Sequence, residues 1–179
     1  MSDRRAFRRD IERMRLTHTG STLRVLVEGL LFDNGFQAVF LYRVARWLKV
    51  HNVRFLAPLV ARLNLFLTGI DINPAADIGP GLRISHGTGM VIGGAARIGE
   101  DALILHGVTV GSLSPSRRGE MPVIGDRAFL GAGAVIVGGI TLGDDVVVGP
   151  NAVVTEDVPD DSRVTTTAGV NVTPRDGAK

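Results

Sequence analysis

Two histidines stand at equivalent places in a regular aliphatic pattern. His86, within ISHGTGMVIGG, lies two residues after Ile84, and His106 lies two residues after Ile104. An imidazole can take the proton from a hydroxyl group, and a neighbouring carboxylate helps by holding the other ring nitrogen protonated and oriented. We therefore expect His86 to act as a general base, with His106 as a second catalytic candidate.

The pattern around these histidines repeats every six residues from position 72 onward. Aliphatic residues recur at positions 72, 78, 84, 92, 98, 104 and 110, and again at 124, 130, 136, 142, 148 and 154. A repeat of six is too short for a helical unit and too long for simple strand alternation. It predicts one short strand and a turn per hexad, with three hexads forming each coil of a parallel β-helix.

Two interruptions of this register mark the candidate site. Ile84 and Ile92 are eight residues apart, so a two-residue bulge falls within positions 86–89. Between Val110 and Ile124 the chain leaves the register for a loop, GSLSPSRRGEMPV. A solenoid can extrude residues at a corner without disturbing its core, and such excursions tend to carry function.

The spacing also places a carboxylate near the histidines. His86 and His106 are 20 residues apart, which is one coil of 18 plus the bulge, and Asp71 precedes His86 by 15. All three should lie near one edge of the β-helix in successive layers, where Asp71 could orient His86. The alternative is that Asp71 caps a turn through its own backbone and that a surface histidine has no role.

The first 70 residues follow a helical pattern instead. STLRVLVEGLLF and NGFQAVFLYRVARWLKV carry apolar residues at three- and four-residue spacing, with a break at Asn34 and Gly35. The more apolar segment 53–70 is too short for a bilayer crossing. It predicts a helix packed on its neighbours or on another subunit, with a peripheral membrane contact as the alternative.

These patterns predict a mainly β fold with three parts. They are a helical domain over 1–70, a β-helix over 71–158 with an extruded loop at 111–123, and a C-terminal tail over 159–179.

Composition excludes several kinds of chemistry. The 179 residues include no cysteine, which removes disulfides, thiolate nucleophiles and cysteine-ligated metals. Only two histidines lie in the predicted β-helix, so a zinc enzyme would lack a third ligand, and we expect no metal. A net charge of +2 indicates no dedicated nucleic-acid surface. The arginine-rich start lacks the apolar core of a secretory signal, which predicts a cytoplasmic protein.

Three longer motifs together resemble the serine acetyltransferase family of hexapeptide-repeat acyltransferases. They are GFQAVFLYRVARWL, LTGIDINPAADIGPGLRISHGTGMVIGGAARIG and IGDRAFLGAGAVIVGGITLGDDVVVGPNAVV, and the resemblance runs from about position 9 to 156. It implies a left-handed β-helix and direct acetyl transfer from acetyl-CoA to a hydroxyl, without an acyl-enzyme. It also implies His86 as the base and Asp71 as its partner.

The resemblance further implies where the cofactor and other subunits bind. The family forms trimers with active sites between adjacent β-helices, and often a dimer of trimers joined through the N-terminal helices. Acetyl-CoA would lie along the coils, with candidate contacts at Gly111, Ser112, Gly131, Ala132 and Pro150.

Four acceptor-side positions depart from the family pattern. The family's aspartate in an Asp-Pro pair is matched by His18, and the aspartate before the catalytic histidine is Ser85. The Arg-His pair of the loop is replaced by Glu120 and Met121. An anionic Glu120 should repel a substrate carboxylate, and Ser85 cannot pair with an ammonium group as a carboxylate would.

These departures lead us to expect a sugar or polysaccharide hydroxyl as the acceptor. Ser85, Thr88, His106 and Glu120 offer hydrogen bonds to a neutral polyol without a cationic clamp. Similar shortened relatives, with HGV at the position of His106 and no Arg-His pair, act in polysaccharide pathways. The alternatives are a serine O-acetyltransferase that makes O-acetylserine for cysteine biosynthesis, and a non-catalytic trimeric scaffold.

Overall fold

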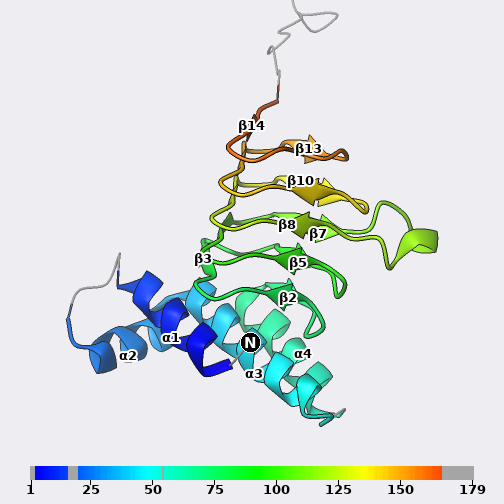
Figure 1. Ribbon diagram of the computed structural model, residues 1–179. Coiled ribbons are helices and arrows are strands. Elements are labelled where there is room, and N and C mark those ends of the chain that lie inside the picture. Colours follow the sequence, from blue (N-terminus) through cyan, green and yellow to red (C-terminus); the bar gives the residue numbers. More distant parts are fainter. Residues whose placement is uncertain (1–2, 16–19, 54, 167–179) are drawn as a thin grey trace, which may run out of the picture.

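The computed structural model describes residues 3–15, 20–53 and 55–166, in which a small group of helices is followed by a tall stack of strands (Figure 1). The helices are α1 (Asp3–Met14), α2 (Thr22–Phe32), α3 (Asn34–Val50) and α4 (Leu56–Thr68). The strands are β1 (Asp71–Ile72), β2 (Asp77–Ile78), β3 (Arg83–Ser85), β4 (Val91–Ile92), β5 (Arg97–Ile98), β6 (Leu103–Leu105), β7 (Thr109–Gly111), β8 (Val123–Ile124), β9 (Phe129–Leu130), β10 (Val135–Val137), β11 (Thr141–Leu142), β12 (Val147–Val148), β13 (Val153–Val154) and β14 (Arg163–Val164).

The strands form three parallel sheets, which are the three faces of a β-helix. The first face has the order β1-β4-β7-β10-β13, the second β11-β8-β5-β2 and the third β14-β12-β9-β6-β3. Every third strand therefore pairs with its counterpart in the next coil, as a hexapeptide repeat requires. The predicted parallel β-helix with its N-terminal helices is confirmed.

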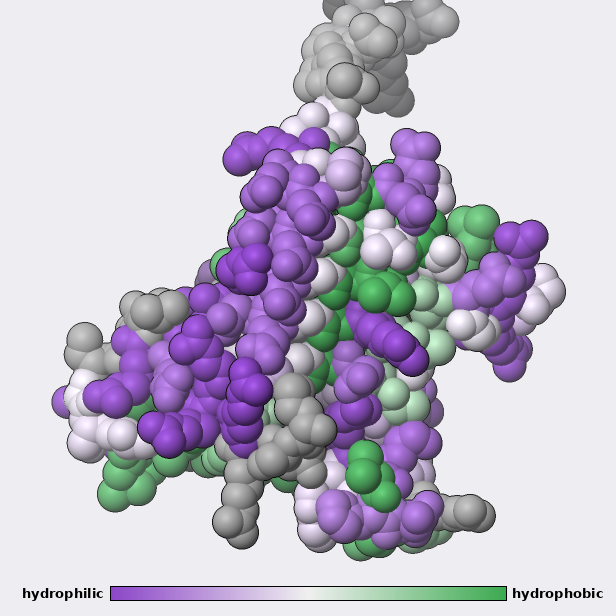
Figure 2. All heavy atoms as spheres, in the orientation of Figure 1, coloured by the Kyte–Doolittle hydropathy of each residue, from purple (hydrophilic) through white to green (hydrophobic). Residues whose placement is uncertain are grey.

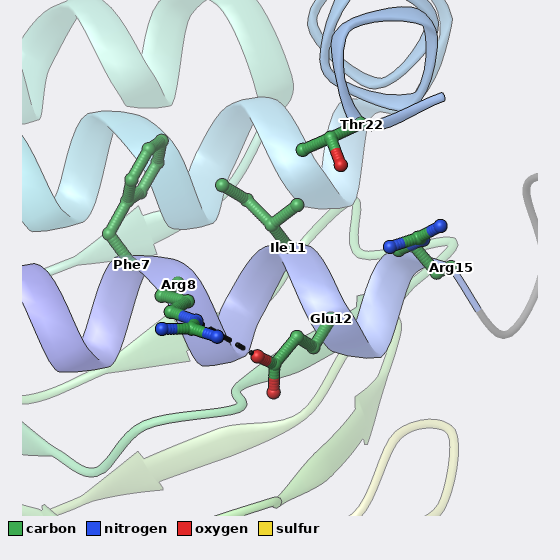
Figure 3. A pocket seen from close by; sticks show the side chains of 6 residues that line it. All are labelled: Phe7, Arg8, Ile11, Glu12, Arg15 and Thr22. Carbon is green, nitrogen blue, oxygen red and sulfur yellow. Dashed lines mark hydrogen bonds and ion pairs between the residues drawn. The ribbon is translucent and has the colours of Figure 1, made fainter. Parts of the chain in front are cut away.

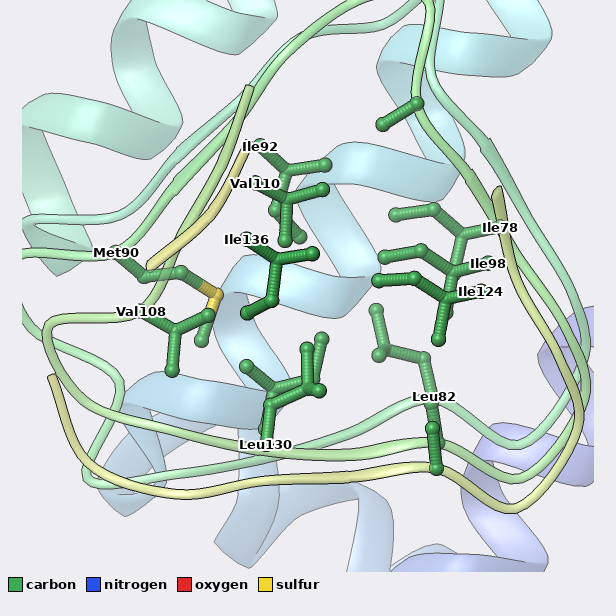
Figure 4. Close-up of a cluster of buried hydrophobic side chains, with 14 of the residues drawn as sticks. Ile78, Leu82, Met90, Ile92, Ile98, Val108, Val110, Ile124, Leu130 and Ile136 are labelled. Carbon is green, nitrogen blue, oxygen red and sulfur yellow. The ribbon is translucent and has the colours of Figure 1, made fainter. Parts of the chain in front are cut away.

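The core is a set of aliphatic columns inside the coils. Ile78, Ile98 and Ile124 come from successive coils and stack along one side, as Figure 4 shows from within the cluster. Each strand alternates one inward aliphatic residue with outward neighbours, which explains the six-residue period in the sequence. Each inward side chain packs on its copies above and below it, so the repeat stabilises itself from coil to coil.

Aspartates at one corner fasten successive coils to one another. The Asp126 carboxylate accepts the Glu100 amide at 2.7 Å, Asp144 accepts the Asp126 amide at 2.8 Å, and Asp160 accepts the Asp144 amide at 2.9 Å. Backbone amides that face outward at the corner are satisfied in this way. The recurring Gly-Asp pairs of the sequence therefore have a structural role.

The helical domain covers the open end of the first coil and is fixed there by one buried ion pair. Arg43 of α3 donates to both oxygens of Asp10 at 2.8 and 3.1 Å and to the Ile78 and Gly79 carbonyls. Asp10 also accepts the amides of Gly81 and Leu82. Since its first strands would otherwise present unpaired edges, the β-helix needs such a cover.

The β-helix continues beyond the end that the sequence pattern predicts. The β-helix was expected to end near residue 158, whereas β14 pairs with β12 at Arg163–Val164.

Within the described part of the chain, no single helix is long and apolar enough to cross a membrane. The pair α2 and α3 passes by length and composition together but is bent by 98°.

Candidate active site

A two-residue bulge separates His86 from the regular coil. Arg83, Ile84 and Ser85 pair with residues 20 positions later, whereas Val135 and Ile136 pair with residues 18 positions later. The extra two residues lie after Ser85, at the corner between the third and first faces. His86 takes up a positive φ of 55°, which few residues other than glycine adopt, and its side chain is exposed.

Corner hydrogen bonds show which residue lies below His106. The Gly107 amide donates to the Thr88 carbonyl at 3.1 Å, the Gly133 amide to the His106 carbonyl at 2.8 Å, and the Asn151 amide to the Ala132 carbonyl at 2.8 Å. Thr88, His106 and Ala132 thus occupy the same corner position in successive coils. The sequence placed His86 below His106, but the bulge puts Thr88 there and moves His86 aside.

Asp71 lies on β1, the neighbouring face of the same layer. Its amide donates to the Met90 carbonyl at 2.9 Å, just after the bulge, and Asp71 pairs with Val91. The residue is half-buried, and Ile72 beside it points inward, so the Asp71 carboxylate points outward. Among the described residues, the side chains of Asp71, His86 and His106 make no hydrogen bond or ion pair with one another or with any other group.

The start of α3 supports the bulge from below. A Cβ atom on Gly35 would lie 2.1 Å from the Ile84 carbonyl oxygen, so the helix rests directly on the strand before His86. Asn34 donates to the Thr88 hydroxyl at 3.4 Å. The sequence pattern predicts only a helix break at Asn34 and Gly35, although a glycine at this place is also a signal for close backbone contact.

The extruded loop begins where β7 ends and returns to the coil through Met121. It carries one short helical turn, η1 (Pro115–Arg117), and projects from the stack in Figure 1. The Met121 sulfur accepts the Ala95 amide at 3.3 Å and occupies the space where Gly93 lacks a side chain. Glu120 is exposed, and its carboxylate lies 3.6 Å from the Arg117 guanidinium.

The candidate cofactor residues fall into two groups. Ala132 and Pro150 continue the corner column above His106, with Gly131 packed against the Pro150 amide. Gly111 and Ser112 lie at the far edge of the first face, where the loop begins, and the space beside Gly111 is open. A ligand that touched both groups would cross the first face of the β-helix.

The helical domain holds a separate pocket, away from the corner with His86. A pocket of about 360 Å³ in the helical domain is lined by Phe7, Arg8, Ile11, Glu12, Arg15 and Thr22, and the Arg8–Glu12 ion pair crosses its rim at 3.2 Å (Figure 3). Its one carboxylate, Glu12, is engaged in ion pairs with Arg8 and Arg9. No cluster of three or more possible metal ligands occurs among the described residues. His18, the remaining acceptor candidate, lies outside them.

Known proteins resemble the chain in both sequence and structure. Residues 121–156 match the model of the bacterial transferase hexapeptide family (six repeats). A serine acetyltransferase of Helicobacter pylori is 42% identical over 132 residues, which are 74% of this chain and 77% of the relative. The chain belongs to the serine acetyltransferase family.

Solved structures of the family have the same fold. The Neisseria gonorrhoeae serine acetyltransferase in complex with serine is 32% identical, with a TM-score of 0.80. The match covers 96% of this chain and 68% of the Neisseria gonorrhoeae chain. The isoform 3 enzyme of Entamoeba histolytica in complex with cysteine reaches a TM-score of 0.84 at 28% identity. The match covers 97% of this chain and 61% of the Entamoeba histolytica protein.

Membership of the serine acetyltransferase family makes the protein an acyltransferase. Acetyl-CoA is the donor implied by these relatives, as the sequence motifs led us to expect. The relatives reported above are serine acetyltransferases, so they favour the serine alternative over the sugar acceptor that the substitutions at Ser85 and Glu120 suggested.

Proposed function

We propose that this protein is a serine O-acetyltransferase, which converts acetyl-CoA and L-serine into O-acetylserine and free CoA. The observation that carries the proposal is the bulge. It presents the exposed imidazole of His86, which has no hydrogen bond within the described part of the chain, at a corner of the β-helix, in a chain whose relatives are serine acetyltransferases. O-acetylserine would then serve cysteine biosynthesis.

The proposed reaction is a direct transfer with His86 as the base. Its ring takes the proton of the serine hydroxyl as that oxygen attacks the thioester carbonyl carbon. The tetrahedral intermediate then collapses, the carbon–sulfur bond breaks, and the CoA sulfur receives the proton from the His86 ring. No nucleophilic side chain of the enzyme is needed, which suits a chain without cysteine.

Asp71 and His106 have supporting roles in this proposal. Asp71 would hold the His86 ring from the neighbouring face once the substrates order the bulge, since catalytic hydrogen bonds often form only in the substrate complex. His106 and Thr88, which stack at the corner, would contact the acceptor together with Ser85. Ala132 and Pro150, higher in the same column, would contact acetyl-CoA, with Gly131, Gly111 and Ser112 as further contacts.

We also propose that the β-helices assemble as trimers. Val91 and Val153 on the first face are 43% and 65% exposed, and Val123 on the second face is 42% exposed. Outward valines on two faces are suited to packing against β-helices of neighbouring subunits. Such packing would place the loop with Glu120 and Met121 near a neighbouring corner.

The acceptor assignment can be tested by CoA release from acetyl-CoA with purified protein. L-serine, D-serine and a panel of mono- and oligosaccharides serve as acceptors, and acetyl-CoA alone gives the hydrolysis rate. Among these acceptors, only L-serine should raise the release of CoA above the hydrolysis rate. Turnover with a saccharide and none with L-serine would overturn the acceptor, whereas silence with every acceptor would favour the scaffold alternative.

A further inference from the structure

Helix α4 has its polar side chains inside and its large apolar side chains outside. Asn64 and Thr68 are 1% and 4% exposed, and the Asn64 amide donates to the Ala38 carbonyl of α3 at 3.1 Å. Phe66, by contrast, is 85% exposed, and its exposed apolar neighbours on the same face are Leu56, Leu59, Leu63 and Leu67. A surface helix normally turns its apolar side chains toward the core and its polar side chains toward water. The outer face of α4 therefore requires an apolar partner.

The exposed apolar surface extends beyond α4 to the end of α3. Trp47 and Val50 near the end of that helix are 45% and 60% exposed, and Phe55 before α4 is 81% exposed. Figure 2 shows patches of hydrophobic surface along the lower edge of the helical end, and others on the coils. We call Trp47, Val50, Phe55 and the five exposed residues of α4 the basal face. Aromatic and leucine side chains together are typical of helices that lie in a membrane interface.

The charge around the basal face has one sign. Between Asp33 and Asp71 the sequence contains five lysines and arginines and no acidic residue. Arg43 and Arg46 are paired with Asp10 and Asp77 of other segments. Lys49 and Arg62, which are exposed, have no acidic partner among the described residues, so this end of the molecule is suited to an anionic surface.

A second copy of the chain is a poorer occupant of this face. Arg62 lies among the exposed leucines of α4, next to Leu63 and three residues after Leu59. A two-fold contact through α4 would bury Arg62 from both copies in one apolar interface without a carboxylate, which is costly. At a bilayer the same side chain can reach lipid phosphates while the leucines enter the acyl boundary.

We infer that the basal face binds the surface of an anionic lipid bilayer, with α4 lying in the interface plane. The helix has 13 residues, too few to cross a bilayer, so the contact is peripheral. The later coils would then stand away from the lipid, since the helices cover only one end of the stack (Figure 1).

Vesicle binding by the full chain tests this inference. Phosphatidylcholine vesicles with and without phosphatidylglycerol are mixed with the protein, and co-sedimentation is measured together with the fluorescence of Trp47, the only tryptophan. We expect binding and a blue shift with anionic vesicles only. The Leu63→Glu/Phe66→Glu variant should bind at least about tenfold more weakly, because both charges would enter the apolar boundary.

Two further variants separate the apolar and electrostatic parts. Arg62→Gln should weaken binding about fivefold at low salt, with a difference that shrinks as salt is added. Thr155→Glu is the control, since Thr155 is exposed just after β13 at the other end of the stack, and it should bind like the wild type.

Three results would overturn the inference. The first is that the wild type does not bind anionic vesicles. The second is that the Leu63→Glu/Phe66→Glu variant binds them as well as the wild type. The third is that the wild type binds no vesicles and light scattering gives the variant half the mass of the wild-type assembly. The last result would assign the basal face to a second copy of the chain. Acetyl transfer measured without lipid is independent of these outcomes, so failure here leaves the proposed function intact.

Discussion

The carbonyl oxygen of Thr88 accepts the Gly107 amide at 3.1 Å, so Thr88 occupies the corner position directly below His106. His86 is therefore one of the two extra residues that the bulge inserts into the regular coil. An imidazole held by the coil register would have its backbone fixed by neighbours above and below. His86 is instead placed by the local packing of the bulge, and changes to that packing should change catalysis.

Substitution of Gly87 by alanine should lower activity by displacing the bulge. A Cβ atom there would lie 2.3 Å from Ile84 Cγ2 and 2.6 Å from Ile70 Cδ1, so either these buried side chains or the backbone beside His86 must shift. A displacement of about 1 Å in a catalytic group can reduce the rate about 10²-fold. We expect a fall of this order in kcat, measured by CoA release.

Gly119→Ala is the control for this change, because a Cβ atom on that loop residue meets nothing within 4 Å. It should keep the wild-type kcat. Equal kcat values for the Gly87 and Gly119 variants would show that the position of the bulge does not control the reaction.

Substitution of Arg43 by methionine should strongly destabilise the junction between helices and coils. The change leaves the Asp10 carboxylate, which is 1% exposed, without its cationic partner. Removal of one member of a buried ion pair costs about 3–5 kcal/mol in the free energy of unfolding. Urea denaturation followed by circular dichroism measures the loss.

Two companion variants give this measurement its meaning. Arg8→Met removes an ion pair of α1 whose arginine is 84% exposed, and it should leave the denaturation midpoint nearly unchanged. Arg43→Met combined with Asp10→Leu should recover part of the lost stability, because no buried charge remains. No recovery in the double variant would mean that the hydrogen bonds of this pair to the coil backbone dominate instead, those of Arg43 to the Ile78 and Gly79 carbonyls and those of Asp10 to the Gly81 and Leu82 amides.

The contact of α1 with the β-helix should weaken in acid. Hydrogen bonds from Arg9 hold the pKa of Asp101 below its ordinary value, despite some opposing desolvation. A carboxyl group whose pKa is lowered by folding contributes stability above its ordinary pKa of about 4, and loses that contribution as pH falls through the folded value. Wild-type stability should therefore decline toward that of Asp101→Asn below about pH 4.

Asn is a suitable replacement because residue 101 has a φ of 59°, which Asn tolerates well. The comparison uses urea midpoints of both proteins between neutral and acid pH. A difference that stayed constant throughout the acid range would contradict a role for the Asp101 charge.

The β-helix could be predicted from sequence because its period is local and strict. Each inward aliphatic packs on a copy one coil away, so the 18-residue steps from Ile92 to Val110 and from Ile136 to Val154 are visible in the sequence spacing. The eight-residue step from Ile84 to Ile92 likewise revealed the bulge. What the spacing could not provide was the alignment at the corner, because two residues can be inserted at any of several positions between Ser85 and Met90.

Contacts between the helices and the coils were not predictable in the same way. Gly35 beneath Ile84, Asn34 beside Thr88 and the Asp10–Arg43 pair join positions far apart in the chain, and no repeat relates them. Met121 is a similar case, since its packing on Gly93 depends on the path of the loop. Periodicity defines a solenoid, whereas its junctions with other elements depend on tertiary packing.

The most direct test of the account is the turnover of His86→Ala beside His106→Ala, with acetyl-CoA and L-serine at saturation. As the general base, His86 should account for about 10²–10⁴-fold of kcat, and its loss should exceed that of His106, which contacts the acceptor. Circular dichroism should show both variants folded, because both side chains are exposed. Undiminished turnover by His86→Ala, or a larger loss in His106→Ala, would contradict the central role of the bulge.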